Sequence, residues 1–261
     1  MSINGIAAMQ RDSPLNAILE LVSLPKDIAL DEAFQAAEAS VSFEAHLEFK
    51  ERLLAAGTED AMAYHFEAIA RTGNADLREV LATFFHWWGK PATGYLLARL
   101  QTESEPLLIG IGLQILGRMR ASGTLTLARR HLHHSDDFVR EKACIVLGWC
   151  GQAADVPRLA ALQTEDPCVA VRKWAATQQA HIHDRLKGVE PKVVANLKKA
   201  IECEADPEVL AMNIFATEMA LGRRFGLRQS DNGEYDPASL SEPRRKALVA
   251  LKNRIGRLHS C

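Results

Sequence analysis

Cysteine is scarce in this chain and shows no pairing pattern. The 261 residues include 5 cysteines, an odd number, and no two of them form a C-x-x-C pair. This usage argues against a disulfide framework and a zinc ribbon, and it favours a reducing compartment. The N-terminal residues lack a basic stretch that leads into an apolar run, and no apolar segment approaches membrane-spanning length. We therefore expect a cytoplasmic, soluble protein.

No charge of one sign dominates. The 31 basic residues nearly balance 33 acidic ones, which argues against uniform attraction to nucleic acid or anionic membranes. The ends differ: residues 1–60 carry 4 basic and 11 acidic side chains, whereas residues 223–261 carry 9 basic and 4 acidic. Both ends could simply be solvated surface. Alternatively, the acidic N-terminal half could meet a basic protein, and the basic C-terminal residues could contact phosphates or an acidic partner; these residues are Arg244, Arg245, Lys246, Lys252, Arg254 and Arg257.

Catalytic motifs are absent as well. The chain contains no G-x-S-x-G, H-E-x-x-H, G-x-x-x-x-G-K-[ST] or G-x-G-x-x-G. Hydrolases, zincins and nucleotide-binding enzymes of the common types would need these parts. We predict no enzymatic activity, no catalytic residue and no cofactor.

What the chain does contain is a repeat of about 31 residues. Residues 77–89 match residues 139–151 at an offset of 62, residues 108–117 lie halfway, and a further copy begins at Val171. Apolar residues fall at relative positions 0, 4, 7, 8 and 11 of each unit. This spacing forms the stripe of an amphipathic helix, because a strand would alternate every second residue.

Breaks that contain glycine, proline or small polar residues follow each stripe, and a second helical segment follows each break. Two helices of about a dozen residues with two turns fill one unit, so each unit is predicted to be a helical hairpin. A lone hairpin cannot bury both sides of its helices, and neighbours must stack. The predicted fold class is all-α, an α-solenoid of stacked hairpins.

Three regions follow from this pattern. We predict an N-terminal helical cap at 1–58, the repeat array at 59–222, and a loop with a basic helix, packed on the array as a second cap, at 223–261. The helices expected outside the array are 14–24, 29–40 and 43–56 in the first cap and 242–256 in the second.

The pattern V-R-x-x-A-x-x-x-L-G at 139–148 resembles the second helix of HEAT-like repeats of the phycobiliprotein-lyase type. The resemblance covers about residues 59–222 and is strongest at 136–176. Two features depart from it, because Ile109 replaces the arginine of one unit and Gln178 and Gln179 replace apolar residues in another. Among bacterial proteins of this size, the resemblance implies an adaptor or an immunity protein that binds and neutralises a toxin.

An arginine column accompanies the repeat. Arg78, Arg140 and Arg172 each follow an acidic residue, which is Asp76, Asp137 or Asp166 respectively. The resemblance implies that these arginines tie adjacent repeats together through hydrogen bonds, and the guanidinium group can make several at once.

A second column lies on the flank of the second helix, about 100° from the centre of the apolar stripe. Trp88 falls inside the stripe and is predicted to be core. Aromatic and cationic side chains share the flank and would suit a protein interface, although packing between helices is an equal alternative. The predicted partner-binding residues are Trp87, Arg118, Lys142, Trp149, Trp174 and His181.

Histidines gather at 131–134 and at 181–184. The first group ends a first helix and the second ends a second helix, so antiparallel hairpins place them at opposite rims. His131 and His134 could share one helical face, but no further ligand is evident. HEAT-like di-iron hydroxylases carry His-Glu pairs, and this chain has none. We predict no metal site.

The expected function is non-enzymatic binding of another protein by stacked second helices. One alternative is a HEAT-like DNA glycosylase or another nucleic-acid-binding solenoid. Residues 61–222 carry 18 basic and 18 acidic side chains, which argues against a groove lined for phosphates. A second alternative, a bilin lyase-like protein, draws only on the shared repeat type.

Overall fold

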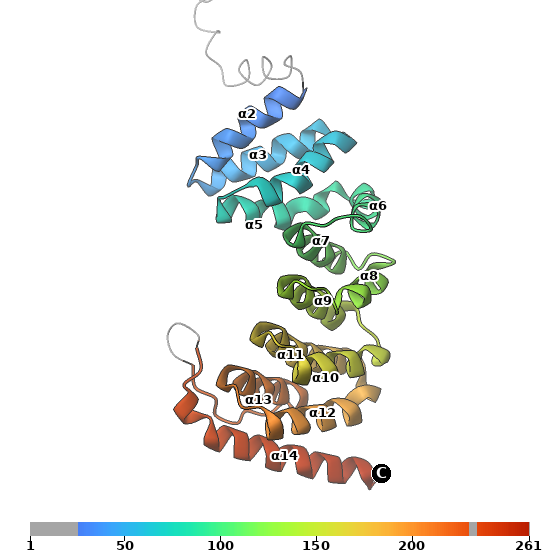
Figure 1. Ribbon diagram of the computed structural model, residues 1–261, viewed down its shortest axis with the longest axis vertical. Coiled ribbons are helices and arrows are strands. Elements are labelled where there is room, and N and C mark those ends of the chain that lie inside the picture. The colour runs from blue at the N-terminus through green and yellow to red at the C-terminus, as the bar shows by residue number, and fades with distance from the viewer. Residues whose placement is uncertain (1–25, 230–233, 261) are drawn as a thin grey trace, which may run out of the picture. The chain divides into compact units, whose positions relative to one another are not determined.

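The computed structural model describes residues 26–229 and 234–260 (Figure 1). This part of the chain consists of helices and connecting segments, and its only extended pairing is an isolated bridge between Gln229 and Tyr235. The predicted all-α class is confirmed. None of the described helices has the length and apolar character that a bilayer crossing requires. The chain divides into two compact units, Met1–Ala92 and Thr93–Cys261.

The first unit packs its helices around aromatic side chains. Phe34, Phe49 and Tyr64 lie in edge or tilted contact, and Phe66 meets Phe85 in the same way. The helix predicted at 43–56 is observed with those bounds, the helix predicted at 29–40 begins and ends slightly earlier, and the helix predicted at 14–24 lies outside the described residues. The elements are α2 (Lys26–Glu38), α3 (Phe43–Ala56), α4 (Glu59–Arg71), α5 (Ala75–Phe84) and the 3₁₀ helix η1 (Phe85–Trp88).

A buried histidine fixes the end of α5. His65 on α4 accepts a hydrogen bond at Nδ1 from the Trp88 indole N–H (3.0 Å), so its Nε2 carries the proton and donates to the Leu81 carbonyl (2.9 Å). Burial lowers the pKa of His65 to about 4. The ring is therefore neutral and joins α4, α5 and η1. Trp88 is half-buried, so it is less enclosed than a core residue.

The second unit stacks helical hairpins (Figure 1). Helices α7, α9, α11 and α13 pack on one another in that order, and α8, α10 and α12 lie beside them as the first helices of successive hairpins. The α-solenoid prediction is confirmed. The bounds are α6 (Lys90–Arg99), which crosses the division between units, α7 (Pro106–Arg118), α8 (Thr124–His131), α9 (Asp137–Cys150), α10 (Val156–Glu165), α11 (Val169–Arg185), α12 (Glu190–Cys203), α13 (Pro207–Leu221) and α14 (Ser241–His259), with short 3₁₀ turns η2 (Ala153–Asp155), η3 (Lys187–Val189) and η4 (Pro237–Ser239).

The predicted stripe explains why the second helices form and where they point. In α9, Val139, Ala143, Val146 and Leu147 are buried, as the column at positions 0, 4, 7 and 8 requires. Asp136 begins the helix, because its side chain accepts a hydrogen bond from the Val139 N–H. Side-chain caps also precede α5, α7 and α13.

The arginine column ties hairpins together in the second unit. Arg140 donates from Nε and Nη2 to the carboxylate of Asp166 (2.8 and 2.9 Å), which precedes the next second helix. Arg172 makes the equivalent but longer contact to Glu204 (3.4 Å). Arg78 differs, since its guanidinium donates only to the Ile69 and Thr72 carbonyls of its own hairpin. The predicted inter-repeat role is therefore wrong for Arg78.

Gln179, one of the two glutamines that replace apolar residues, belongs to a buried amide network. Gln179 on α11 donates to Gln163 on α10 (2.6 Å), and Gln163 donates to Asn213 on α13 (2.8 Å). Asn196 on α12 donates to Gln179 (2.8 Å). Four helices of two hairpins thus meet through side-chain amides whose hydrogen bonds offset the cost of burial.

Helix α14 lies against α12 and α13 at the end of the second unit (Figure 1). Ala247 and Leu251 are buried there. Basic residues of α14 largely serve this packing or pair within the helix: Arg254 binds Glu190, Arg244 donates to the Glu202 carbonyl, and Arg245 and Lys246 pair with Glu242. Of the basic cluster predicted from the sequence, only Lys252 and Arg257 are exposed without a contact among the described residues.

Candidate functional site

One side of the second helices in the second unit is only partly covered by the hairpins: Arg118, Trp174, His181 and Met219 are exposed there, whereas Ile111, Ile145 and Thr177 are buried. In α11, Gln179 faces α10, Gln178 lies against Gly148 of α9, and Lys173 pairs with Glu208 at the start of α13 (2.8 Å). Trp174 and His181 lie on the remaining side, at relative positions 3 and 10. We call the equivalent positions the second-helix face: Ile111, Gln114 and Arg118 on α7; Lys142, Ile145 and Trp149 on α9; Trp174, Thr177 and His181 on α11; Met212, Phe215 and Met219 on α13.

The second-helix face combines apolar and cationic side chains and contains no carboxylate of its own. Trp174 is 40% exposed and Met219 is 36% exposed, which makes them two of the large hydrophobic side chains that the described residues leave open. Met212 and Phe215 are half-buried beside them. Its ionisable groups are Arg118, Lys142 and His181, all cationic or neutral. An apolar surface rimmed by charge of one sign is typical of an interaction site.

Five of the six predicted partner-binding residues lie on this face, in different environments. Arg118 and His181 are exposed. Lys142 is half-buried, with Nζ 2.9 Å from Glu141 Oε1 and 4.7 Å from the centre of the Phe138 ring. Partial burial lowers the pKa of His181, so its ring is neutral at pH 7, and the two cations Arg118 and Lys142 are not equally available to a partner.

Trp149 packs against the neighbouring repeat. A Cβ placed on Gly117 of α7 would lie 3.2 Å from Trp149 Cε3, so the indole occupies the space that glycine leaves. The Cys150 thiol beside it donates to the Gly117 carbonyl (3.4 Å). Of the two alternatives for this column, packing between helices describes Trp149, whereas Trp174 stays open.

Trp87, the sixth predicted residue, belongs to the first unit and lies in η1. Its side chain is 53% exposed, but one face of the ring covers the buried Lys50, whose Nζ lies 4.3 Å from the Trp87 ring and 4.7 Å from the Phe84 ring. Lys50 Nζ also pairs with Glu51 (2.5 Å). Cation–π contacts of this kind compensate a buried ammonium group.

Two arginines that the column analysis missed stand at the C-terminal ends of these helices. Arg185 of α11 donates to the Gly148 and Gly151 carbonyls (3.1 and 2.8 Å) and so closes the end of α9. Burial lowers the pKa of Arg185, and the nearby Arg120 lowers it further. Arg120 follows α7 with φ of 49°.

The described residues supply no metal site. His131 and His134 have ring centres 5.7 Å apart, but no group of three potential ligands surrounds them or any other point of the described chain. His134 Nδ1 accepts a hydrogen bond from the Asp136 N–H. The other histidine group lies in α11, where His183 donates from Nε2 to the Ala220 carbonyl (3.2 Å). The thiol of Cys150 has a pKa raised by burial, which disfavours a nucleophilic thiolate.

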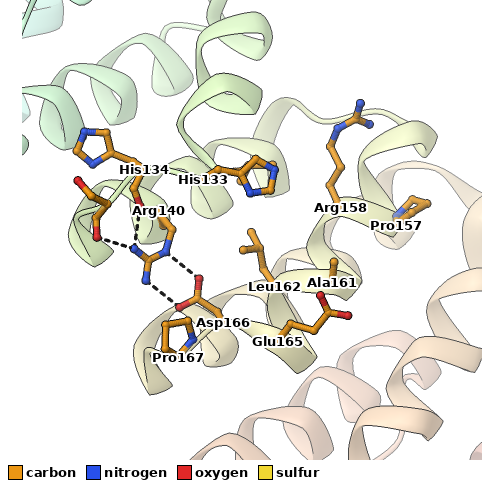
Figure 2. A pocket seen from close by; sticks show the side chains of 12 residues that line it. His133, His134, Arg140, Pro157, Arg158, Ala161, Leu162, Glu165, Asp166 and Pro167 are labelled. Carbon is orange, nitrogen blue, oxygen red and sulfur yellow. Dashed lines mark hydrogen bonds and ion pairs between the residues drawn. The ribbon is translucent and has the colours of Figure 1, made fainter.

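A cleft of about 690 Å³ lies beside the Arg140–Asp166 pair, between the end of α8 and α10 (Figure 2). Its charged floor is already engaged, because Arg140 also donates to the His134 and Ser135 carbonyls. Figure 2 shows the His133 and His134 rings pointing to different sides of Arg140. The cleft therefore exposes the side of a structural ion pair and brings no reactive groups together.

Comparison with known proteins agrees with the stacked hairpins. A family model described as HEAT repeats matches residues 94–181, which run from α6 to α11. No curated protein matches the chain. The match falls on the hairpins that carry Arg118, Lys142, Trp149, Trp174 and His181, and it identifies residues 94–181 as HEAT-like repeats.

Proposed function

We propose that this chain is a non-enzymatic protein-binding scaffold that holds its partner on the second-helix face. HEAT repeats form a helical scaffold that is often used for protein interaction. The observation that carries the proposal is the open Trp174 on a face without carboxylates. Tryptophan and arginine supply much of the binding energy at protein interfaces, and this face presents both.

Two roles fit such a scaffold. An immunity protein would cover the active site of one toxin, which needs a large complementary surface. An adaptor would hold several partners more weakly. We place the protein in the cytoplasm for either role, on the cysteine usage described above.

Site-directed photo-cross-linking in the native cell tests the proposal. A photoreactive amino acid at position 174 should give a discrete covalent product with another protein. The matched control is Ala195, which is exposed on α12, a first helix, and should give no such product. Identical products from both positions would contradict the proposed face.

The identity of the cross-linked protein separates the two roles. A single stoichiometric partner with a nuclease or membrane-active domain supports the immunity role, and several partners support the adaptor role. The same cross-linked samples, compared after digestion and mass spectrometry, give both answers.

A further inference from the structure

Positive charge without carboxylate partners gathers at the C-terminal edge of the second-helix face. Arg118 and Arg120 make no ion pair among the described residues, and Arg185 uses its guanidinium on backbone carbonyls. The exposed His181 lies on the same edge but adds no charge at pH 7, because partial burial lowers its pKa. Asp184 is the one carboxylate of α11 near it, and it offsets a single charge. The edge is therefore net positive.

The apolar part of the face continues from this edge. Met212, Phe215 and Met219 follow one another along α13 at spacings of three and four residues, so they form one ridge on its open side. Trp174 lies on the adjacent α11. Methionine and aromatic side chains adapt to the side chains of an incoming helix, because thioethers are flexible and polarizable.

Arg120 shows that the charge is not there for the fold. Its left-handed backbone conformation suits glycine, and an arginine in this conformation is strained. The hydrogen bonds that end α7 involve backbone groups alone: Arg120 N donates to the Gly117 carbonyl, and Ala121 N donates to the Leu116 carbonyl. Among the described residues the Arg120 side chain makes no hydrogen bond or ion pair that would offset this strain. Backbone strain that no stabilising contact compensates is typical of a functional position.

We infer that the partner segment on the second-helix face is an acidic amphipathic helix of another protein. Its apolar side would cover Trp174 and the α13 ridge, and its carboxylates would pair with Arg118 and Arg120. Charge-assisted hydrogen bonds between arginine and carboxylate are strong and set the orientation of the bound segment. Helices with one apolar side dock in this manner on apolar faces. This inference rests on the proposed protein-binding function.

A panel of three synthetic peptides tests the inference. All three have the same leucine-lined helical side, and the opposite side carries glutamate, glutamine or lysine. Fluorescence anisotropy with the full chain should show that the glutamate peptide binds at least about tenfold more tightly than the lysine peptide, with the glutamine peptide between them. The advantage should shrink as salt is raised, because screening weakens contacts between exposed charges.

Two variants locate the site. Arg120→Gly should weaken binding of the glutamate peptide several-fold and leave binding of the glutamine peptide unchanged. It should also raise the melting temperature of the chain, since glycine relieves the strain. Arg118→Glu should weaken binding of the glutamate peptide further, because it reverses the charge. Lys199→Glu, which makes the same charge change on the exposed side of α12, is the matched control and should leave all three affinities unchanged.

Each remaining outcome decides against the inference. The lysine or glutamine peptide could bind as tightly as the glutamate peptide or more tightly, and Trp174→Ala could abolish this binding. The face would then remain a protein-binding surface, but the inference of an acidic partner would be overturned. Binding of a DNA or RNA oligonucleotide in competition with the peptides, lost in Arg118→Glu, would assign the edge to phosphates. No binding of any peptide would also overturn the inference, and the cross-linking at position 174 would still judge the proposed function independently.

Discussion

In the second unit Arg140 reaches across to the next hairpin, whereas in the first unit Arg78 stays within its own. Both arginines occupy the same place in the repeat. Arg140 meets Asp166 in a bidentate pair that is almost fully buried, and Arg172 repeats the contact with Glu204. The second unit therefore gains cohesion from hairpin to hairpin through the arginine column. In the first unit that task falls to carboxylates of α2, because Asp31 accepts from Tyr64 (2.5 Å) and Arg71 (3.1 Å) and Glu38 accepts from the Gly73 N–H (2.8 Å).

The tryptophans of the flank differ in the same way. Trp87 covers the buried Lys50 in the first unit and Trp149 fills the space over Gly117, whereas Trp174 is 40% exposed and covers no charged group among the described residues. Position in the repeat thus sets the direction of a side chain, whereas its structural role depends on the residue that it contacts. Trp174 is the member of the column that remains for a partner.

The largest effect is expected when the ion pair between hairpins is broken. Asp166→Ala should cost about 3–5 kcal/mol of unfolding free energy, because it leaves the buried Arg140 without a counter-charge. Arg78→Ala should cost about 1–2 kcal/mol, since it removes hydrogen bonds to backbone carbonyls only. Urea unfolding of both variants measures the difference. Equal losses would remove the contrast between the two units.

Acid should weaken the first unit through His65. The buried ring has a pKa of about 4, whereas in the unfolded chain it titrates near 6.5. The unfolded state therefore binds more protons between these values, so the free energy of unfolding falls as pH falls from 6.5 to 4, by roughly 3 kcal/mol from this group. His65→Gln keeps a donor and an acceptor and should flatten this pH dependence.

Fluorescence can assign that loss to the first unit. In a background with Trp149→Phe and Trp174→Phe, only the first unit retains tryptophans, namely Trp87 and Trp88. The unfolding midpoint that they report should fall between pH 7 and pH 4 when His65 is present, and it should stay constant in the His65→Gln variant. If the His65→Gln variant lost stability with falling pH as steeply as the chain with His65, the assigned role of the ring would be refuted.

Crowding between second helices gives a smaller effect. A Cβ on Gly148 would come within 1.8 Å of Gln178 Oε1 and 2.6 Å of its Cδ, so the buried amide would have to change rotamer. Gly148→Ala should therefore cost about 1–3 kcal/mol. Gly94→Ala is the control, because nothing lies within 4 Å of its Cβ position in α6, and it should gain about 0.5–1 kcal/mol. A neutral Gly148→Ala would show that α9 and α11 pack less tightly than described.

The smallest stability effect separates the two exposed tryptophans. Trp87→Ala should lower stability by about 1 kcal/mol, because Lys50 loses one of its two aromatic contacts. Trp174→Ala should change stability by less than about 0.5 kcal/mol, the usual range for an exposed position without such a contact. Thermal unfolding of the two variants would contradict this distinction if Trp174→Ala were the less stable.

The sequence predicted the repeat well because its evidence is periodic. Columns such as Val139, Ala143 and Leu147 recur at helical spacing, and burial follows from that spacing alone. The amide network could not be predicted, because Gln163, Gln179 and Asn213 are brought together by stacking and lie far apart in the chain. Arg120 was missed because its importance depends on a backbone angle.

The most direct measurement is the affinity of the chain for the partner that cross-links through position 174, compared with the affinity of Trp174→Ala. If the second-helix face holds the partner, the variant should bind about 30-fold more weakly, the loss of a central anchor worth about 2 kcal/mol, with an unchanged unfolding midpoint. Unchanged affinity in a fully folded Trp174→Ala variant would contradict the account.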